Sequence, residues 1–213
     1  NLLPEFTDSY EFSSIYDKGD LSLSFSVYHR YSTAVVERVS RFEDNVNITM
    51  PMNIGTSQTT GLEANVRYDL AEWVRVNGDF NYNYFNRQGE LEGASFDFNA
   101  NQWTTKVTTR FKLPADVDFE VTGQYESAFQ TVQGNMAENY FFDMGFRKKI
   151  MKSRGVINFS VRDIFATRIM QNEIVQENFT LFNRQQRGRF VTLGFSYGFG
   201  KGEAMEFSGR KRF

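Results

Sequence analysis

The sequence has few of the residues that cross-link, kink or catalyse: no cysteine, three prolines and one histidine in 213 residues. Without cysteine it can form neither a disulfide framework nor a thiolate metal site, which suits a protein exposed to the periplasm. It has no apolar run as long as the roughly 18 residues that a transmembrane helix requires. The formal net charge of −2 gives no sign of a nucleic-acid partner.

The sequence is also poor in the residue types that usually carry out catalysis. A serine hydrolase needs a histidine beside an activated serine and an orienting acid. The single histidine, His29, instead falls in phase with the apolar side of an expected strand, near the outer rim, so we predict no enzymatic activity. Carboxylates such as Glu43, Asp44 and Asp97 could hold a divalent ion in loops, but no ligand spacing supports it. We therefore predict no cofactor and no metal site.

Aromatic residues are abundant, with 23 Phe, 10 Tyr and 2 Trp, yet the mean hydropathy of −0.49 is that of a polar protein. These two values conflict for an ordinary soluble core. They agree for a transmembrane β-barrel, in which polar residues that face a wet lumen alternate with apolar residues that face lipid.

The most informative pattern lies at residues 191–199. Small or polar residues there alternate with large apolar ones, namely Val191, Leu193, Phe195, Tyr197 and Phe199. Because side chains on a strand alternate between two faces, the large apolar residues share one face. A soluble sandwich would cover that face with a second sheet, whereas a membrane barrel would turn it to lipid.

The same two-residue period recurs along the chain and predicts about nine strands. Their expected ranges are 7–16, 20–38, 58–70, 74–86, 103–113, 117–129, 139–150, 155–171 and 182–199. Short turns are expected at 17–20, 71–73, 114–116 and 152–154. Long polar segments, expected to be loops, alternate with these turns near 41–57, 87–101, 130–139 and 172–186. Short periplasmic turns and long extracellular loops are typical of outer-membrane barrels.

The expected number of strands is odd, whereas a complete bacterial barrel has an even number. If the short turns are periplasmic, the first and last strands both run toward the periplasm. We therefore predict an all-β fold in which residues 1–200 form the C-terminal strands of a larger antiparallel transmembrane barrel. Residues 201–213 are expected to form a periplasmic tail.

Charged residues opposite the apolar face are expected to line the lumen, because Arg or Lys facing lipid at the midplane would cost about 2–4 kcal/mol. These residues are Glu63, Arg67, Arg75, Asp79, Lys106, Arg110, Asp118, Glu120, Glu126, Arg147 and Arg162. Neighbouring strands bring opposite charges within cross-strand reach. We interpret them as a solvated, mutually neutralising wall that contacts a plug, with a substrate path as the alternative.

Five phrases, in this order, resemble strands of TonB-dependent outer-membrane receptors. Residues 1–11 resemble the opening of a late barrel strand, and residues 19–30 resemble the strand that returns from it. Residues 60–68 resemble a strand with a Gly-x-Glu motif. Residues 161–168 resemble the Val-x-Asp-x-Phe-Asn-Thr-Arg strand of the large outer-membrane β-barrel family within these receptors, and residues 191–200 resemble its closing strand. Together the phrases cover nearly the whole chain.

The resemblance implies a barrel of about 22 strands with an N-terminal plug. It implies active import of a large nutrient of the siderophore, glycan or peptide class, with this segment forming barrel wall and extracellular loops. The implied partners are outer-membrane lipid, the rest of the barrel with its plug, and the TonB complex through an N-terminal region outside this sequence. A surface lipoprotein is a further candidate partner. The closing strand is implied to be the signal that the barrel-assembly machinery reads.

Two other classes stay open at this point. A self-contained small outer-membrane barrel would act as a lipid-modifying enzyme or an adhesin, and a full gene without several hundred upstream residues would support it. A soluble β-sandwich would stay monodisperse without detergent. The sandwich is disfavoured because the charges on the second face of so many strands need water.

Overall fold

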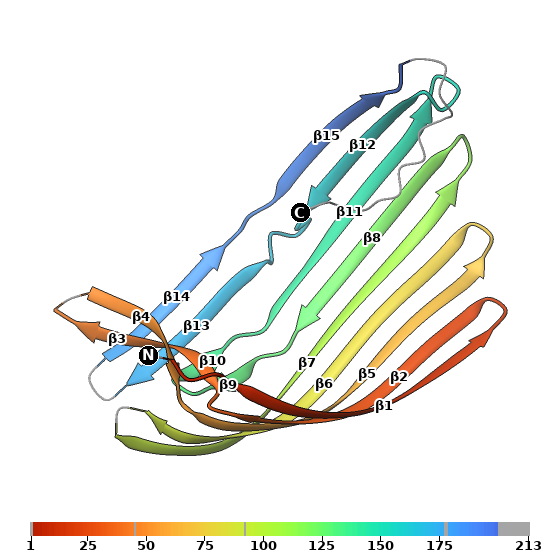
Figure 1. Cartoon of the computed structure of the whole chain (residues 1–213). Coiled ribbons are helices and arrows are strands. Elements are labelled where there is room, and N and C mark those ends of the chain that lie inside the picture. Colours follow the sequence, from red (N-terminus) through yellow and green to blue (C-terminus); the bar gives the residue numbers. More distant parts are fainter. Residues whose placement is uncertain (1, 45, 92, 177–178, 200–213) are drawn as a thin grey trace.

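The computed structural model describes residues 2–199 except 45, 92, 177 and 178, and these residues fold into antiparallel strands (Figure 1). Nine strands form the main sheet, in the order β1-β2-β5-β6-β7-β8-β11-β12-β15. Their bounds are β1 Phe6–Lys18, β2 Leu21–Thr33, β5 Gly55–Ala71, β6 Val74–Leu91, β7 Ala94–Leu113, β8 Val117–Glu126, β11 Asn139–Ile150, β12 Gly155–Arg162 and β15 Phe190–Tyr197. The predicted all-β antiparallel fold is confirmed.

The main sheet is curved and open (Figure 1). Each strand pairs with the strands that precede and follow it in the sheet, and β1 and β15 are the two edges. Among the described residues, neither edge has a partner on its outer side. The predicted succession of nine strands is therefore confirmed, and the sheet does not close on itself.

The two ends of the main sheet differ in their connections (Figure 1). Short turns join β1 to β2, β5 to β6, β7 to β8 and β11 to β12 at one end, as the sequence predicts. At the other end the expected loops are wrong in detail, because these segments also form strands. They are β3 Val36–Glu43, β4 Val46–Asn53, β9 Phe129–Thr131, β10 Gly134–Met136, β13 Ile169–Gln176 and β14 Phe179–Gln186, and the pairing of β6 with β7 continues to Leu91 and Ala94.

These hairpins pack together, and we call them the hairpin cap: β3–β4, the Leu91 ends of β6 and β7, β9–β10 and β13–β14. Val39, Ile54 and Leu91 form its buried apolar cluster. Beside it the buried amide of Gln133 bonds the backbone of Ser40 twice. The Ser40 N–H donates to Oε1 at 2.8 Å, and Nε2 donates to the Ser40 carbonyl at 2.9 Å. The expected loops are therefore an ordered layer with its own small core.

One predicted strand ends early for a visible reason. Strand β12 ends at Arg162, whereas the alternation predicts a strand over 155–171. Asp163 adopts a positive φ of 53° and its side chain is buried, with 1% exposed. Its carboxylate accepts the backbone N–H groups of Thr167 at 2.8 Å and Arg168 at 3.1 Å. This turn takes the chain out of β12 and into β13.

The predicted strand over 182–199 is likewise divided, because β14 ends at Gln186 and Gly188 has a positive φ of 71° before β15 begins. Among the described residues, no helix is long and apolar enough to cross a membrane. The predicted periplasmic tail, residues 201–213, lies outside the described residues, as does Gly200.

Candidate functional site

The register of the main sheet gives it one apolar face. Residues directly opposite each other on neighbouring strands point to the same side. Successive partners from β6 to β15 form an apolar row that consists of Val74, Phe111, Phe119, Phe146, Phe159 and Leu193. A second row from β1 to β7 consists of Phe12, Val27, Leu62, Tyr82 and Trp103. Aromatic contacts reinforce both, with Phe111 and Phe119 stacked at 5.9 Å and Trp103 and Tyr125 at 4.5 Å.

The opposite face is polar. The row one residue away from the first apolar row consists of Asp69, Arg75, Arg110, Glu120, Gly145, Ser160 and Thr192. Charged side chains occupy the β5–β8 part of this row, and small ones occupy the β11–β15 part. In this row, therefore, the charge is concentrated on β5–β8, and the small side chains of β11–β15 leave space.

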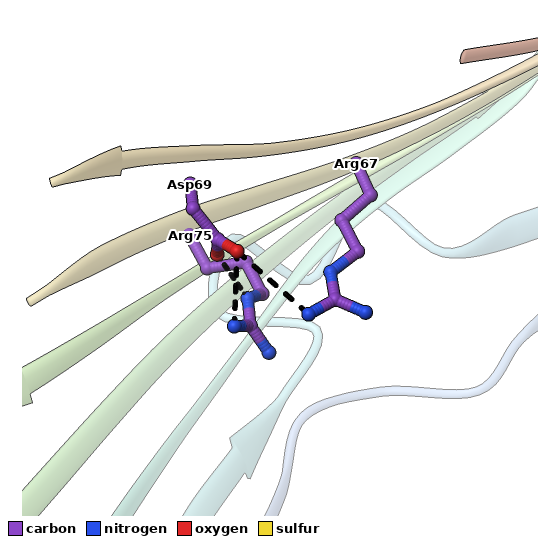
Figure 2. A network of polar contacts seen from close by, with 3 residues as sticks. All are labelled: Arg67, Asp69 and Arg75. Carbon is purple, nitrogen blue, oxygen red and sulfur yellow. Dashed lines mark hydrogen bonds and ion pairs between the residues drawn. The ribbon is translucent and has the colours of Figure 1, made fainter. Parts of the chain in front are cut away.

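Arg67, Asp69 and Arg75 form a charge cluster (Figure 2). The register places it on the polar face, beside the short turn between β5 and β6. Arg75 donates to both carboxylate oxygens of Asp69, with Nη2 at 3.1 Å from Oδ2, and Nη2 of Arg67 lies 3.7 Å from the same oxygen. Arg75 also stands directly opposite Arg110, which would repel it. Asp69 offsets this repulsion. The predicted lumen set includes Arg67, Arg75 and Arg110 but not Asp69, although Asp69 follows Arg67 at the two-residue period.

Other predicted wall residues are also paired. Nη2 of Arg110 lies 2.7 Å from Oε2 of Glu120, so the expected cross-strand ion pair is confirmed there. Glu63 accepts the amide of Asn81 at 3.0 Å, and Glu126 accepts that of Gln102 at 2.8 Å. Two more pairs of opposite charges stand directly opposite each other on neighbouring strands, Asp79 with Lys106 and Asp118 with Arg147. Exposed pairs of this kind are worth about 0–1 kcal/mol, so they neutralise the wall more than they stabilise it.

A hollow of about 660 Å³ lies over β7, β8, β11 and β12. Its polar lining includes Lys106, Glu120, Asp143, Arg162 and Arg168. Its floor includes Gly145, where a side-chain Cβ would meet no atom within 4 Å. A smaller hollow of about 180 Å³, lined by Glu63 and Asp79, shares Lys106 with it. The structure thus brings five of the eleven predicted wall residues to two adjoining hollows. The other six lie outside them, namely Arg67, Arg75, Arg110, Asp118, Glu126 and Arg147.

Arg168 is a residue of the larger hollow that the periodicity does not predict. Its guanidinium lies over the ring of Phe141, 3.5 Å from the centroid, in a cation–π contact. Arg168 reaches this position because the turn at Asp163 binds its backbone N–H. The only sequence signal for this turn is the phrase over residues 161–168.

Residues 1–197 match the outer membrane protein beta-barrel family. The chain belongs to this family. No curated protein and no solved structure matches it. The membership confirms the predicted location in the outer membrane. A member of the outer membrane protein beta-barrel family needs an apolar face toward lipid, and the two apolar rows supply one.

In this family member, β15 is an edge strand with its apolar residues exposed. Val191, Leu193 and Phe195 stand opposite Val161, Phe159 and Ile157 of β12. Tyr197 stands opposite Gly155, and Phe199 lies beyond the strand with its ring 4.8 Å from that of Tyr197. The five residues predicted to form the closing strand's apolar face thus lie along the last strand and just past it.

The residues considered above for catalysis or metal binding do not line either hollow. His29 lies in β2, and its Nδ1 is 2.8 Å from Oγ1 of Thr60 on β5. Within the described part of the chain, no three histidine or carboxylate residues are placed to hold a metal ion. In the hairpin cap, burial lowers the pKa of Arg87, which still carries its charge in an ion pair with Glu37.

Proposed function

We propose that this chain is the C-terminal part of a TonB-dependent receptor that imports a large nutrient across the outer membrane. The observation that carries the proposal is the open sheet of nine strands, with free edges at β1 and β15. Every residue of β1 is exposed in the described structure. Lipid cannot satisfy free backbone N–H and C=O groups, so further strands must pair with these edges in the membrane.

A barrel larger than this sheet encloses a wide lumen, which such transporters fill with a plug. The polar face supports this arrangement, because ion pairs such as Arg110 with Glu120 neutralise part of its charge and its hollows leave room for a second polypeptide. We propose that the plug contacts this face near Lys106, Arg162 and Arg168. The segment's own role is then structural rather than catalytic: it forms wall toward lipid and lumen, and its hairpin cap takes part in nutrient capture.

The nutrient is proposed to be a siderophore, a glycan or a peptide, and a surface lipoprotein is a further proposed partner. A self-contained small barrel is the less favoured candidate, because β1 would have to pair with β15. In this antiparallel succession of nine strands β1 and β15 run in the same direction, whereas complete bacterial barrels have an even number of antiparallel strands. A soluble sandwich is disfavoured by the apolar rows, which no second sheet covers among the described residues.

The test uses the full-length protein, purified from outer membranes in detergent. We expect it to bind the isolated periplasmic domain of TonB in surface plasmon resonance. The matched control is the same protein without the residues that precede its plug. Loss of binding in the control would support the proposal, whereas no binding by the full-length protein, or equal binding by both, would overturn it.

The proposed assembly signal in β15 predicts unequal effects of two neighbouring substitutions. Phe195 lies two residues from the end of β15, where an arginine can reach the interface and costs only about 0–1 kcal/mol. If the strand is read by the assembly machinery, Phe195→Arg should still lower the folded protein in the outer membrane several-fold. Ser196→Arg, on the other face, should leave it near the wild-type level. Heat-modifiable migration of outer-membrane fractions measures the folded protein, and equal losses in both variants would contradict the prediction.

A further inference from the structure

The four-stranded sheet of the hairpin cap, in the order β14-β13-β10-β9, carries a cavity of about 380 Å³. We call it the cap groove. Its polar lining consists of Gln130, Asn135, Gln171 and Glu173, and its apolar lining includes Phe129, Met136 and Phe182. The volume lies at the low end of the range for small-ligand pockets, which is roughly 300–1,000 Å³. It therefore suits a short stretch of a chain molecule.

The register shows that the cap groove is built by the sheet. Gln130, Asn135, Glu173 and Phe182 are successive cross-strand partners from β9 to β14, so their side chains point to one side. Gln171 precedes Glu173 by two residues on β13 and shares that side. Strand pairing thus holds three amides, a carboxylate and a phenyl ring on one surface.

The polar groups of the cap groove have no partner within the described residues. None of Gln130, Asn135, Gln171 and Glu173 makes a side-chain hydrogen bond or ion pair there. Nearby amides of the hairpin cap behave differently. Gln133 uses both ends of its amide on Ser40, and Asn86 donates to Asp97 at 2.8 Å. The groove therefore leaves donors and acceptors available to a ligand.

The chemistry of this lining favours a hydroxylated, uncharged ligand. An amide both donates and accepts, as a hydroxyl group does, and the carboxylate of Glu173 can accept from two hydroxyl groups. Phe182, with 56% of its surface exposed, offers a ring face to the apolar C–H face of a sugar. Glu173 is the only charged residue of the lining, so anionic ligands are disfavoured. Arg184, opposite Gln171 on β14, lies outside the lining.

We infer that the cap groove binds a neutral oligosaccharide. This inference rests on the proposed function, in which the hairpin cap takes part in capture, and it names the nutrient class. The two are separable, because the groove makes its contacts with residues of β9, β10, β13 and β14 alone, whereas import depends on the TonB complex.

The test is isothermal titration calorimetry on the full-length protein in detergent. The probes are the neutral hexasaccharides of maltose, cellulose, xylan and mannan type, with an oligogalacturonate and a hexapeptide as contrasts. At least one neutral hexasaccharide is expected to bind, and Phe182→Ala is expected to weaken its Kd about tenfold. Asn183→Ala, the next residue and on the other face of β14, is the matched control and should bind like wild type. Since Phe182 is exposed, both variants should fold, which heat-modifiable migration verifies.

The inference is overturned if no neutral hexasaccharide binds, if only the oligogalacturonate or the peptide binds, or if Phe182→Ala and Asn183→Ala bind alike. The proposed function has a separate readout. Oligosaccharide binding at the groove in a protein that fails to bind TonB would overturn the proposed import function and would support the inference about the cap groove. TonB binding without any hexasaccharide binding would support the proposed import function and overturn the inference about the cap groove.

Discussion

Val107→Arg is expected to keep most of the full-length protein from folding in the outer membrane, whereas Thr108→Arg should leave most of it folded. Val107 belongs to β7, four residues from Trp103 on one side and from Phe111 on the other. Both aromatic residues lie in contacts with rings of neighbouring strands. Aromatic residues of this kind mark the two interfaces of a membrane barrel, which places Val107 near the bilayer midplane.

The expected loss of stability in Val107→Arg follows from the depth of Val107 in the membrane and from the residues around it. Val107 is 45% exposed and its cross-strand partners are Gly78 and Gly123, so no side chain directly opposite it could shelter a cation. Four residues of strand span about 13 Å, which is too far for an arginine to reach water easily. The cost is therefore about 2–4 kcal/mol. Thr108 instead has the polar partners Asn77 and Thr122, and its Oγ1 lies 3.0 Å from that of Thr122.

Urea unfolding of the protein folded into lipid vesicles measures both variants. The free energy of unfolding should fall by about 2–4 kcal/mol for Val107→Arg relative to Thr108→Arg. Val107→Leu is the conservative control and should behave like wild type, because it keeps an apolar side chain toward lipid. Equal losses for the two arginine variants, or a larger loss for Thr108→Arg, would reverse the assignment of the two faces.

The sequence alone predicts the main sheet well, because the alternation that creates its two faces is local. The period of two residues is visible in any short window, and the turns at the short-turn end are too brief to admit another structure. Register then follows, since a slip of one residue would turn a row such as Phe119 and Phe146 to the polar side.

The hairpin cap could not be predicted in this way. Its hairpins are held against one another by partners that are distant in the chain, such as Gln133 with the backbone of Ser40, 93 residues away. Short segments such as β9 and β10 carry too few residues to show a period. The cap groove depends on four strands in register, so none of its members stands out in the sequence.

Some of the residues that line the hollow on the polar face belong to the set predicted to face the lumen. Lys106, Glu120 and Arg162 follow from the alternation, since they lie on regular strands. Arg168 does not, because it is brought there by a turn that a continuous strand over 155–171 would exclude. Asp163 ends that strand through hydrogen bonds to its own neighbours, and the alternating pattern carries no information on such local competition.

Asp163→Ala is therefore expected to be strongly destabilising. The carboxylate of the buried Asp163 accepts the N–H groups of Thr167 and Arg168, and its loss would leave these two half-buried residues' backbone donors without an acceptor. Each unpaired buried donor costs about 1–3 kcal/mol. Alanine is also less suited than aspartate to the positive φ of 53° at this position. The free energy of unfolding in lipid vesicles should fall by about 3 kcal/mol or more.

Asp163→Asn separates the hydrogen bonds from the backbone conformation. Asparagine tolerates a positive φ and keeps one side-chain oxygen, so it can still accept one of the two N–H groups. Its loss of stability should be about half that of Asp163→Ala. Hydrogen exchange should rise over residues 163–176 in both variants, more in the alanine variant, because the turn positions the start of β13. Because the turn holds the backbone of Arg168, whose guanidinium lies over Phe141, we expect the alanine variant also to expose Phe141, which is now buried. Equal losses of stability in the two variants would mean that the carboxylate's hydrogen bonds do not hold the turn.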